Sequence, residues 1–192
     1  SHERSRRGEP VNFLFLGAVA RTKGILDLLD AIAAHKDELD GRFILHIGGC
    51  GPDDALADET IRKHNLGNLV VRHGWVTGEA KDRLIAASDV FILPSYAEGQ
   101  PISLLESMAA SMPAIVTPVG GIPELIDEGV NGVYCTPRDT ESIFRAIFHF
   151  IEHPHDIETM GERNYIKVRP FFPAPTRDKL INLYTELCNR EK

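Results

Sequence analysis

The sequence predicts an α/β fold built on a parallel sheet of about six strands with helices on both faces. Short apolar runs alternate with segments of helical periodicity along most of the chain, which is the pattern of strand–helix–strand crossovers. The first run, residues 11–16, is almost wholly apolar, as in strands buried on both faces of a parallel sheet. The length of 192 residues fits one domain with a sizeable core.

Six apolar segments are expected to form the strands. The first stops at Gly17 and the second at Gly48, and glycine is common where a strand ends in a tight turn. The fourth stops at Pro94, which cannot continue a hydrogen-bonded ladder. In order, the segments are residues 11–16, 43–47, 69–71, 90–93, 114–116 and 132–135.

Helices are expected between these strands, because apolar residues recur at helical spacing after Gly24 and across residues 54–64. Thr77 is expected to cap a third helix, which carries Leu84 and Ile85. A fourth follows residue 101. The helix after the sixth strand is expected to be capped by Asp139 or Thr140.

The two ends of the chain differ from its middle. Residues 1–10 are basic and lack an apolar face, and are interpreted as a linker or cloning remnant ahead of one domain at 11–192. Near the other end, a proline-rich irregular segment at 170–175 leads to a last helix at 176–188.

Composition narrows the function. A net charge of −7 argues against nucleic acid as the main partner, so an anionic ligand must meet a local positive site. Cys50, Cys135 and Cys188 form no CxxC pair, which favours a reducing compartment, and no membrane span or signal peptide is visible. The expected location is therefore cytoplasmic. No metal-ligand grouping or covalent nucleophile motif is present either.

The loops after the strands should share one rim, because ligands of such sheets bind outside the carboxyl ends of the strands. The loop at 17–24 places Arg21 and Lys23 there, just ahead of a helix, and it matches neither GxGxxG nor a Walker A sequence. The two cations are either a diphosphate clamp or ordinary solvated loop charges.

Three further rim features each leave two interpretations open. The glycine-rich turn at 48–52 is either a phosphate nest or a tight turn. Trp75 either stacks on a base or packs at a strand end. Gly120 and Gly121 either allow close approach of the backbone to a ligand or form a flexible turn.

The stretch at 94–113 is the most informative part of the chain. Glu98 lies in a loop that should face the ligand crevice, with no obvious partner, which favours a functional role. Glu106 either completes a capping box with Ser103 or, if the helix begins at or before Ile102, lies one turn inside it. Because a helix N-terminus attracts phosphate and carboxylates accept hydrogen bonds from hydroxyls, the expected ligand is phosphorylated and rich in hydroxyls.

Taken together, these motifs resemble the C-terminal, donor-binding domain of retaining glycosyltransferases of the GT-B architecture, family 4. The match runs from about residue 15 to 184 and implies a Rossmann-like sheet that forms one half of a GT-B fold. It rests on the 17–24 loop, Gly48-x-x-Gly51-Pro52, His73-Gly74-x-Val76, Pro94-Ser95-x-x-Glu98-Gly99, Glu106-x-Met108-Ala109, Pro113, Gly120-Gly121-x-Pro123-Glu124 and Asn131-Gly132.

The resemblance implies transfer of a hexose-type sugar from a nucleoside diphosphate sugar, UDP- or GDP-linked, with retention of anomeric configuration and no metal. Lys23, with Arg21, would contact the diphosphate; Glu98 would bind hydroxyls of the transferred sugar, and Glu106 those of the ribose. The other implied donor-site residues are Gly17, Gly99, Gln100, Pro101, Ile102, Ser103 and Val76. The backbone N–H groups around 100–103 would reach the phosphates, and the main chain near Val76 would meet the base.

The chain departs from the family pattern at several positions. Ala18 stands where an arginine is usual, Gln100-Pro101 replaces Phe-Gly, and Ser111 stands where glycine usually ends the helix. The family's N-terminal domain, which would hold a glycan or lipid-linked acceptor, has no counterpart here. The alternative function is a non-catalytic nucleotide-sugar-binding or interaction module. Peripheral association of the full-length protein with the inner face of the membrane stays open.

Overall fold

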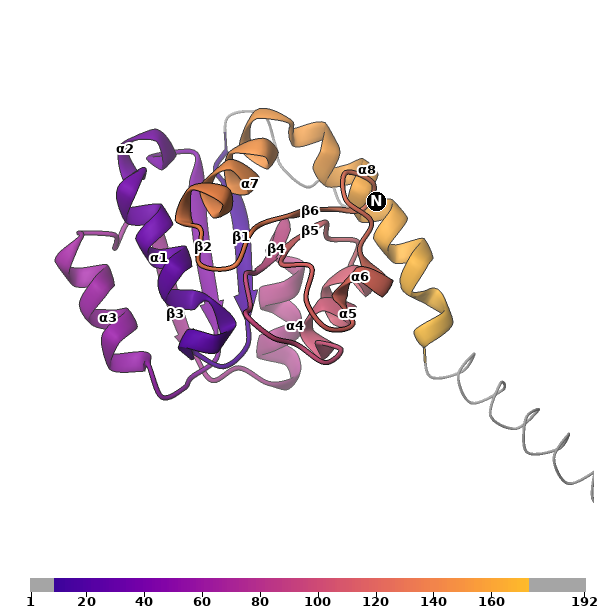
Figure 1. Cartoon of the computed structure of the whole chain (residues 1–192), viewed down its shortest axis with the longest axis horizontal. Helices are drawn as coiled ribbons and strands as arrows, with labels where there is room; N and C mark the ends of the chain where they lie inside the picture. The colour runs from indigo at the N-terminus through magenta and orange to yellow at the C-terminus, as the bar shows by residue number, and fades with distance from the viewer. Residues whose placement is uncertain (1–8, 173–192) are drawn as a thin grey trace, which may run out of the picture.

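The computed structural model describes residues 9–172, which form a parallel sheet covered by helices on both faces (Figure 1). Strands and helices alternate along the chain as the apolar periodicity predicts. The elements are β1 (Val11–Leu16), η1 (Arg21–Lys23), α1 (Ile25–Ala34), α2 (Lys36–Leu39), β2 (Phe43–Gly48), α3 (Asp54–Lys63), β3 (Val70–Gly74), α4 (Gly78–Ala86), β4 (Val90–Leu93), α5 (Ile102–Ala109), β5 (Ala114–Val116), α6 (Ile122–Leu125), β6 (Gly132–Tyr134), α7 (Thr140–Glu152), α8 (Pro154–Val168) and η2 (Arg169–Phe171).

The six strands lie in the order β3-β2-β1-β4-β5-β6, and every neighbouring pair is parallel. β1 is the centre: Phe13 is in register with Leu45 of β2 on one side and with Val90 of β4 on the other. The chain runs outward from β1 to β3 and then outward from β4 to β6. The order therefore reverses between β1 and β4, and a crevice opens at the carboxyl ends of these two strands.

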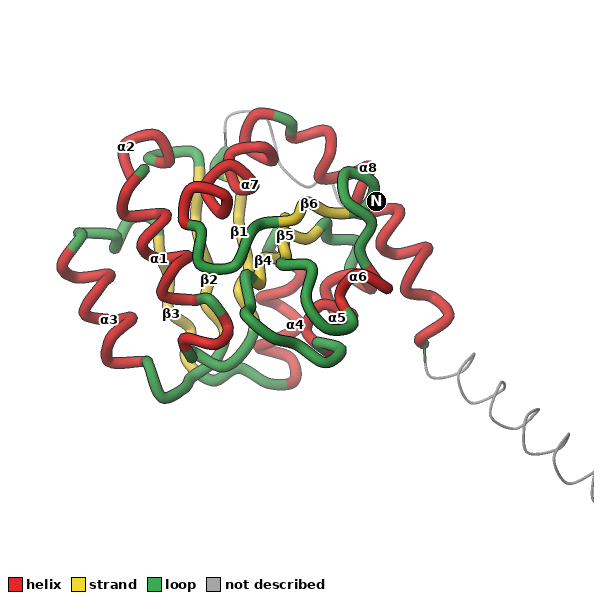
Figure 2. The backbone as a smooth tube through the Cα atoms, viewed as in Figure 1, coloured by secondary structure: helices red, strands yellow, loops and turns green. Residues whose placement is uncertain are grey.

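Two helical layers enclose the sheet. α1 packs against α3 and α7 on one face, and α4 and α5 cover the other, where α5 packs against α8 (Figure 1). The loops that follow β1, β2, β3 and β4 gather along the lower edge of the view in Figure 2. That edge is the rim on which a ligand site is expected.

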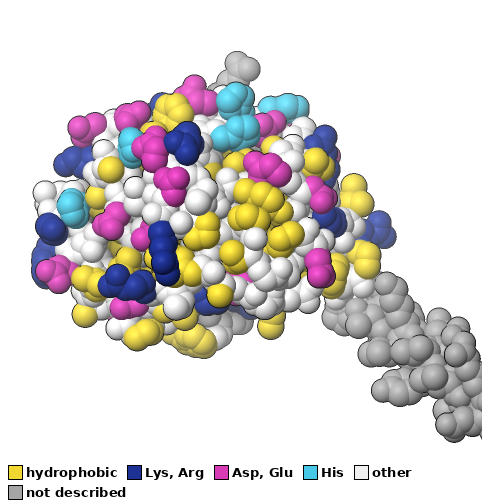
Figure 3. All heavy atoms as spheres, viewed as in Figure 1, with side chains coloured by type: hydrophobic (Ala, Val, Ile, Leu, Met, Phe, Trp, Pro, Cys, Tyr) yellow, Lys and Arg dark blue, Asp and Glu magenta, His cyan; other side chains and the backbone are white. Residues whose placement is uncertain are grey.

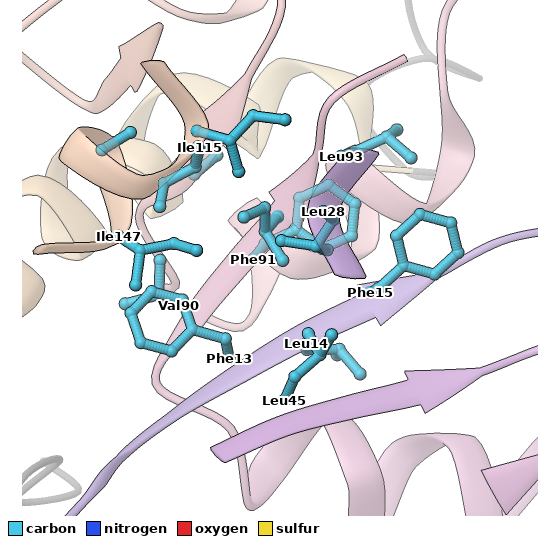
Figure 4. Packing of buried hydrophobic residues seen from close by; sticks show 14 of the residues in the cluster. Phe13, Leu14, Phe15, Leu28, Leu45, Val90, Phe91, Leu93, Ile115 and Ile147 are labelled. Carbon is cyan, nitrogen blue, oxygen red and sulfur yellow. The ribbon is translucent and has the colours of Figure 1, made fainter. Parts of the chain in front are cut away.

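The core joins the sheet to the α1–α7 layer. Figure 4 shows side chains from β1, β2, β4 and β5 meeting Leu28 of α1 and Ile147 of α7, all of them buried. Phe13 also contacts Phe43, with ring centroids 4.8 Å apart. Burial of this much apolar surface is the main stabilising term of the fold.

The six expected strands are confirmed, and β3 extends further than expected, to Gly74. Asp139, rather than Thr140, caps α7, because its carboxylate accepts the Ser142 N–H at 2.9 Å. Thr77 is the N-cap residue of α4, but its side chain makes no capping hydrogen bond.

The sequence did not predict α8. Its buried face includes Gly161 and Asn164, which interrupt the apolar pattern on which helix prediction depends. The expected irregular segment at 170–175 is described only as far as Phe172, where it forms the end of η2 and its C-cap residue. The rest of that segment and the expected last helix at 176–188 lie outside the described residues.

On the face in Figure 3, Lys and Arg side chains are interspersed with Asp and Glu, so that face carries no broad basic patch. Among the described helices, none is long and apolar enough to cross a membrane.

Candidate functional site

A pocket of about 570 Å³ lies at the carboxyl ends of β1 and β4, where the strand order reverses. Its volume is within the range of small-molecule sites. It is lined by Leu16, Gly17, Ala18, Lys23, Gly48, Gly49, Trp75, Val76, Thr77, Lys81, Leu93, Glu98, Gln100, Pro101, Ile102, Ser103 and Glu106. Loops after four strands and the first turns of two helices thus meet around one cavity.

Lys23 reaches this pocket from the end of η1, and the next residue explains its position. Gly24 has φ +72°, and a Cβ there would lie 2.0 Å from the carbonyl oxygen of Pro94. The η1 turn therefore presses directly against the loop that carries Glu98, which a side chain at residue 24 would prevent. The backbone N–H of Tyr96 donates to Thr22 O at 2.9 Å and joins the two loops again.

Tyr96 fixes the same junction through its side chain. Its hydroxyl donates to Asp27 Oδ2 of α1 at 2.6 Å, and the Arg138 guanidinium carbon lies 4.6 Å from its ring centroid. Burial, with the hydrogen bond to Asp27, raises the pKa of Tyr96 above its ordinary value. The hydroxyl therefore stays a donor at neutral pH and holds the loop after β4 against α1.

Glu98 is the most buried charge in the pocket, with 6% of its side chain exposed. Its Oε1 accepts hydrogen bonds from Lys23 Nζ at 2.8 Å and from Ser95 Oγ at 2.6 Å. Within the described residues its Oε2 accepts none. The carboxylate is thus held in place by a cation and a hydroxyl, with one oxygen left for a ligand hydroxyl.

The N-terminus of α5 supplies donors beside this carboxylate. Pro101 is the N-cap residue and offers no side-chain cap, and no acidic residue stands in the first turn. The N–H groups of Ile102 and Ser103 find no acceptor within the described part of the chain. Unpaired N–H groups and the positive end of the helix dipole make this turn suited to an anion.

Glu106 lies one turn inside α5, because the helix begins at Ile102. This decides between the two interpretations of the sequence: Ser103 is not the N-cap, so the two residues form no capping box. The carboxylate instead accepts a hydrogen bond from Lys81 Nζ of α4 at 2.5 Å. A second Lys–Glu pair therefore faces the pocket.

The other predicted site residues divide into two groups. Gly17, Val76, Gln100, Pro101, Ile102 and Ser103 all line the pocket. Arg21 and Gly99 do not line it; Arg21 is exposed on η1, and its backbone N–H donates to Asp53 Oδ2 at 2.6 Å. Of the two cations predicted in this loop, only Lys23 therefore belongs to the lining.

The open interpretations of the rim are also decided in part. Trp75 lines the pocket with 75% of the residue exposed, so it does not pack at a strand end. Gly120 and Gly121 do not line it: a Cβ on Gly120 would lie 1.7 Å from Glu98 O, and Gly121 N–H donates to Gly99 O at 2.8 Å. These glycines support the Glu98 loop.

Gly48 and Gly49 line the pocket and also allow two loops to meet. Gly49 has φ +136°, and a Cβ on it would lie 2.0 Å from Gly17 O. Both interpretations of this turn, a tight loop and a phosphate contact, are compatible with its place.

Sequence reasoning missed Lys81, Ser95 and Tyr96. Lys81 could have been found as a cation in the first turn of the helix that follows the third strand, hence on the rim. Ser95 lies only three residues before Glu98, inside the Pro94-Ser95-x-x-Glu98-Gly99 motif, so its contact with Glu98 is local in sequence. Tyr96 carries no such signal, because its partners Asp27 and Thr22 are distant in sequence. No group of three or more potential metal ligands occurs in the part of the chain that the structure describes.

A model of the family described as glycosyl transferases group 1 matches residues 2–167. This chain belongs to that family. An uncharacterized glycosyltransferase of Methanocaldococcus jannaschii is 32% identical over 130 residues, covering 68% of this chain and 33% of that protein. The chain thus spans about a third of that glycosyltransferase.

Solved structures agree with the family assignment. Sucrose-phosphate synthase from Thermosynechococcus elongatus superposes with a TM-score of 0.80 at 26% identity, over 95% of this chain and 46% of that one. The Anabaena protein HepE, solved in complex with UDP and glucose, gives a TM-score of 0.79 at 21% identity, over 93% of this chain and 48% of that one. The fold is that of a little under half of each of these two chains.

Proposed function

We propose that this chain is the donor-binding half of a retaining glycosyltransferase, which moves a hexose-type sugar from a nucleoside diphosphate sugar to a glycan or lipid-linked acceptor. The observation that carries the proposal is the pocket at the β1–β4 reversal. It brings Glu98 and Glu106, each paired with a lysine, to the uncapped N-terminus of α5. Membership of the family supports the reaction class.

Each part of such a donor has a matching group. Glu98, with Oε2 open, accepts hydroxyls of the sugar, and Glu106 accepts those of the ribose. The N–H groups of Ile102 and Ser103 meet the diphosphate together with Lys23. The base lies near Val76, where exposed Trp75 offers an aromatic face.

The same groups would favour bond cleavage. When the bond from the sugar to the diphosphate breaks, negative charge grows on the leaving nucleoside diphosphate. Lys23 and the α5 N–H groups are fixed by the fold before the reaction, so they stabilise that charge without reorganising. We assign retention of configuration, and UDP or GDP as the carrier, from the family resemblance, and we expect binding without a metal.

Calorimetric titration with UDP, GDP and ADP and with their sugars, with and without EDTA, tests the proposal. We expect saturable binding to at least one of them, unchanged by EDTA. Glu98→Gln should bind the nucleoside diphosphate at least as tightly as the wild type but lose the additional affinity conferred by the sugar. Glu79→Gln, exposed on α4, should resemble the wild type. A folded chain that binds none of these ligands would refute the donor-site assignment.

The second candidate, a nucleotide-sugar-binding module without transfer, is favoured by one observation. Ala18 lines the pocket, so this part of the wall brings no side-chain charge to the phosphates. Incubation of the full-length protein with the sugar nucleotide that binds, and with glycan and lipid acceptors, separates the two. A transferase releases nucleoside diphosphate from the sugar nucleotide. A binding module without transfer activity binds the sugar nucleotide and releases no nucleoside diphosphate. The acceptor would be held by a further domain in a cytoplasmic protein.

A further inference from the structure

The Lys81–Glu106 pair is the least constrained charged contact of the pocket. Lys81 comes from the first turn of α4 and Glu106 from the second turn of α5, and their Nζ and Oε1 atoms are 2.5 Å apart. The two side chains also line a groove of about 480 Å³ between α4 and α5. There is thus open space on both sides of the pair, and the ammonium can leave Glu106 by rotation of its own stem.

The charges of the pocket make such a movement favourable. The charged side chains that line it are Lys23, Lys81, Glu98 and Glu106, which balance one another. A ligand with two phosphates adds several negative charges to this neutral lining. Since Arg21 lies outside the lining and residue 18 is alanine, Lys81 is the second cation that the lining offers.

The burial of the two glutamates decides which lysine can move. Glu98 has 6% of its side chain exposed, so loss of the Lys23 ammonium would leave a buried carboxylate without its cation. Glu106 has 33% exposed and can be satisfied by water or by ligand hydroxyls. Lys81 also has three donor protons and one acceptor within the described residues. Its ammonium is therefore free to change partner at low cost.

We propose that Lys81 is a phosphate-binding residue of this site. On ligand entry its ammonium moves from Glu106 to a phosphate oxygen, and Glu106 is freed in the same step to accept ligand hydroxyls. Lys81 thus brings a second positive charge to the ligand phosphates. Its movement also exposes the Glu106 carboxylate as a hydroxyl acceptor only when a ligand is present. This inference rests on the proposed function, and it adds a residue to the donor site.

Titrations of wild-type and variant chains with a nucleoside diphosphate and with its parent nucleoside, UDP with uridine or GDP with guanosine, test this role. Trp75, the single tryptophan of the chain, lines the pocket and reports binding by its fluorescence. Lys81→Met should weaken diphosphate binding about 10- to 100-fold, as expected for a lost charged hydrogen bond. Nucleoside binding should change less than about twofold, since Glu106 stays available.

Two variants serve as controls. Lys81→Arg keeps the charge and should recover most of the affinity. Arg83→Met removes a cation from the same helix whose partner is exposed Glu79, outside the pocket, and should bind like the wild type. Circular dichroism of Lys81→Met checks that Glu106 without its partner leaves the fold intact; should that variant unfold, Lys81→Gln, which can still donate to Glu106, carries the same comparison.

The outcomes are distinct. A wild-type chain that binds no nucleoside diphosphate refutes the proposed function, and the role of Lys81 with it. If the wild type binds but Lys81→Met binds the diphosphate equally well, the role of Lys81 alone is refuted. An equal loss for diphosphate and nucleoside refutes it too, because Lys81 would then act on the nucleoside or on the fold and not on phosphate.

Discussion

The ammonium of Lys23 and the carboxylate of Glu98 meet at 2.8 Å although the residues are 75 positions apart in the chain. Lys23 ends η1 after β1, and Glu98 lies in the loop after β4. The two strands are neighbours in the sheet, so their loops meet at its carboxyl edge. This ion pair joins the two loops, and both of its side chains line the pocket.

Lys23 and Arg21 should therefore differ in their contribution to binding, although only one residue separates them. Lys23→Ala should weaken nucleoside diphosphate binding by about 1–3 kcal/mol, because it removes a charged donor and leaves Glu98 to repel the phosphates. Arg21→Ala, which removes a cation outside the lining, should change binding by less than about 0.5 kcal/mol. Calorimetry measures both, and equal losses in the two variants would contradict the geometry.

Gly24 and Gly41 form a matched pair for stability. Both have a left-handed backbone, φ +72° and +69°, but a Cβ on Gly24 would lie 2.0 Å from Pro94 O, whereas one on Gly41 would meet nothing within 4 Å. Gly41→Ala should lower the free energy of unfolding by about 1 kcal/mol, the conformational cost alone. Gly24→Ala should lower it by about 3 kcal/mol or more, because two backbones must separate. Urea unfolding gives both values; similar losses would show that the contact with Pro94 tolerates a methyl group.

Ser111 should be a position where glycine stabilises the protein. It follows the C-cap residue of α5 with φ +59°, while Met112 N–H donates to Ser107 O and Ser111 N–H to Met108 O, as in a Schellman motif. Ser111→Gly should raise the free energy of unfolding by about 1 kcal/mol, since glycine adopts this conformation without strain. Thermal unfolding should show a higher Tm. Ala110→Gly, at φ −88°, is the control and should lower it.

His46 should make stability depend on pH. It lies on β2, 3.0 Å from His73 Nε2 through its Nδ1. Burial, with the neighbouring His73, lowers the pKa of His46 below its ordinary value of 6.5, and Asp89 offsets part of this. A lowered pKa means that the unfolded chain binds the proton more readily, so the free energy of unfolding should fall as pH falls from about 7 to 5. Urea unfolding across that range should give a flatter curve for His46→Gln than for the wild type or for exposed His155→Gln; parallel curves would contradict the assignment.

Much of the fold could be predicted because it depends on local patterns. β4 and β5 are continuous apolar runs and β1 and β2 are interrupted by a single polar residue, so the switch from apolar runs to helical spacing is visible along the sequence. α8 escaped prediction because its buried face carries Asn164, whose amide donates to Met112 O at 2.7 Å and to Asn131 O at 2.8 Å. A polar residue satisfied by distant backbone atoms breaks the apolar pattern without breaking the helix.

The sequence by itself determined the α/β class and the rim on which the loops gather, because these depend on chain order. It also predicted Glu98, Glu106 and Lys23 as residues of that rim, and all three line the pocket. Only the tertiary structure decided which charges pair. It joined Lys23 to Glu98 and Lys81 to Glu106, and it left Arg21 outside the lining. Ion pairs between loops depend on which strands become neighbours and on how closely backbones approach, as Gly24 does to Pro94. Neither the order of strands in the sheet nor the approach of one backbone to another can be read from the spacing of residues along the chain.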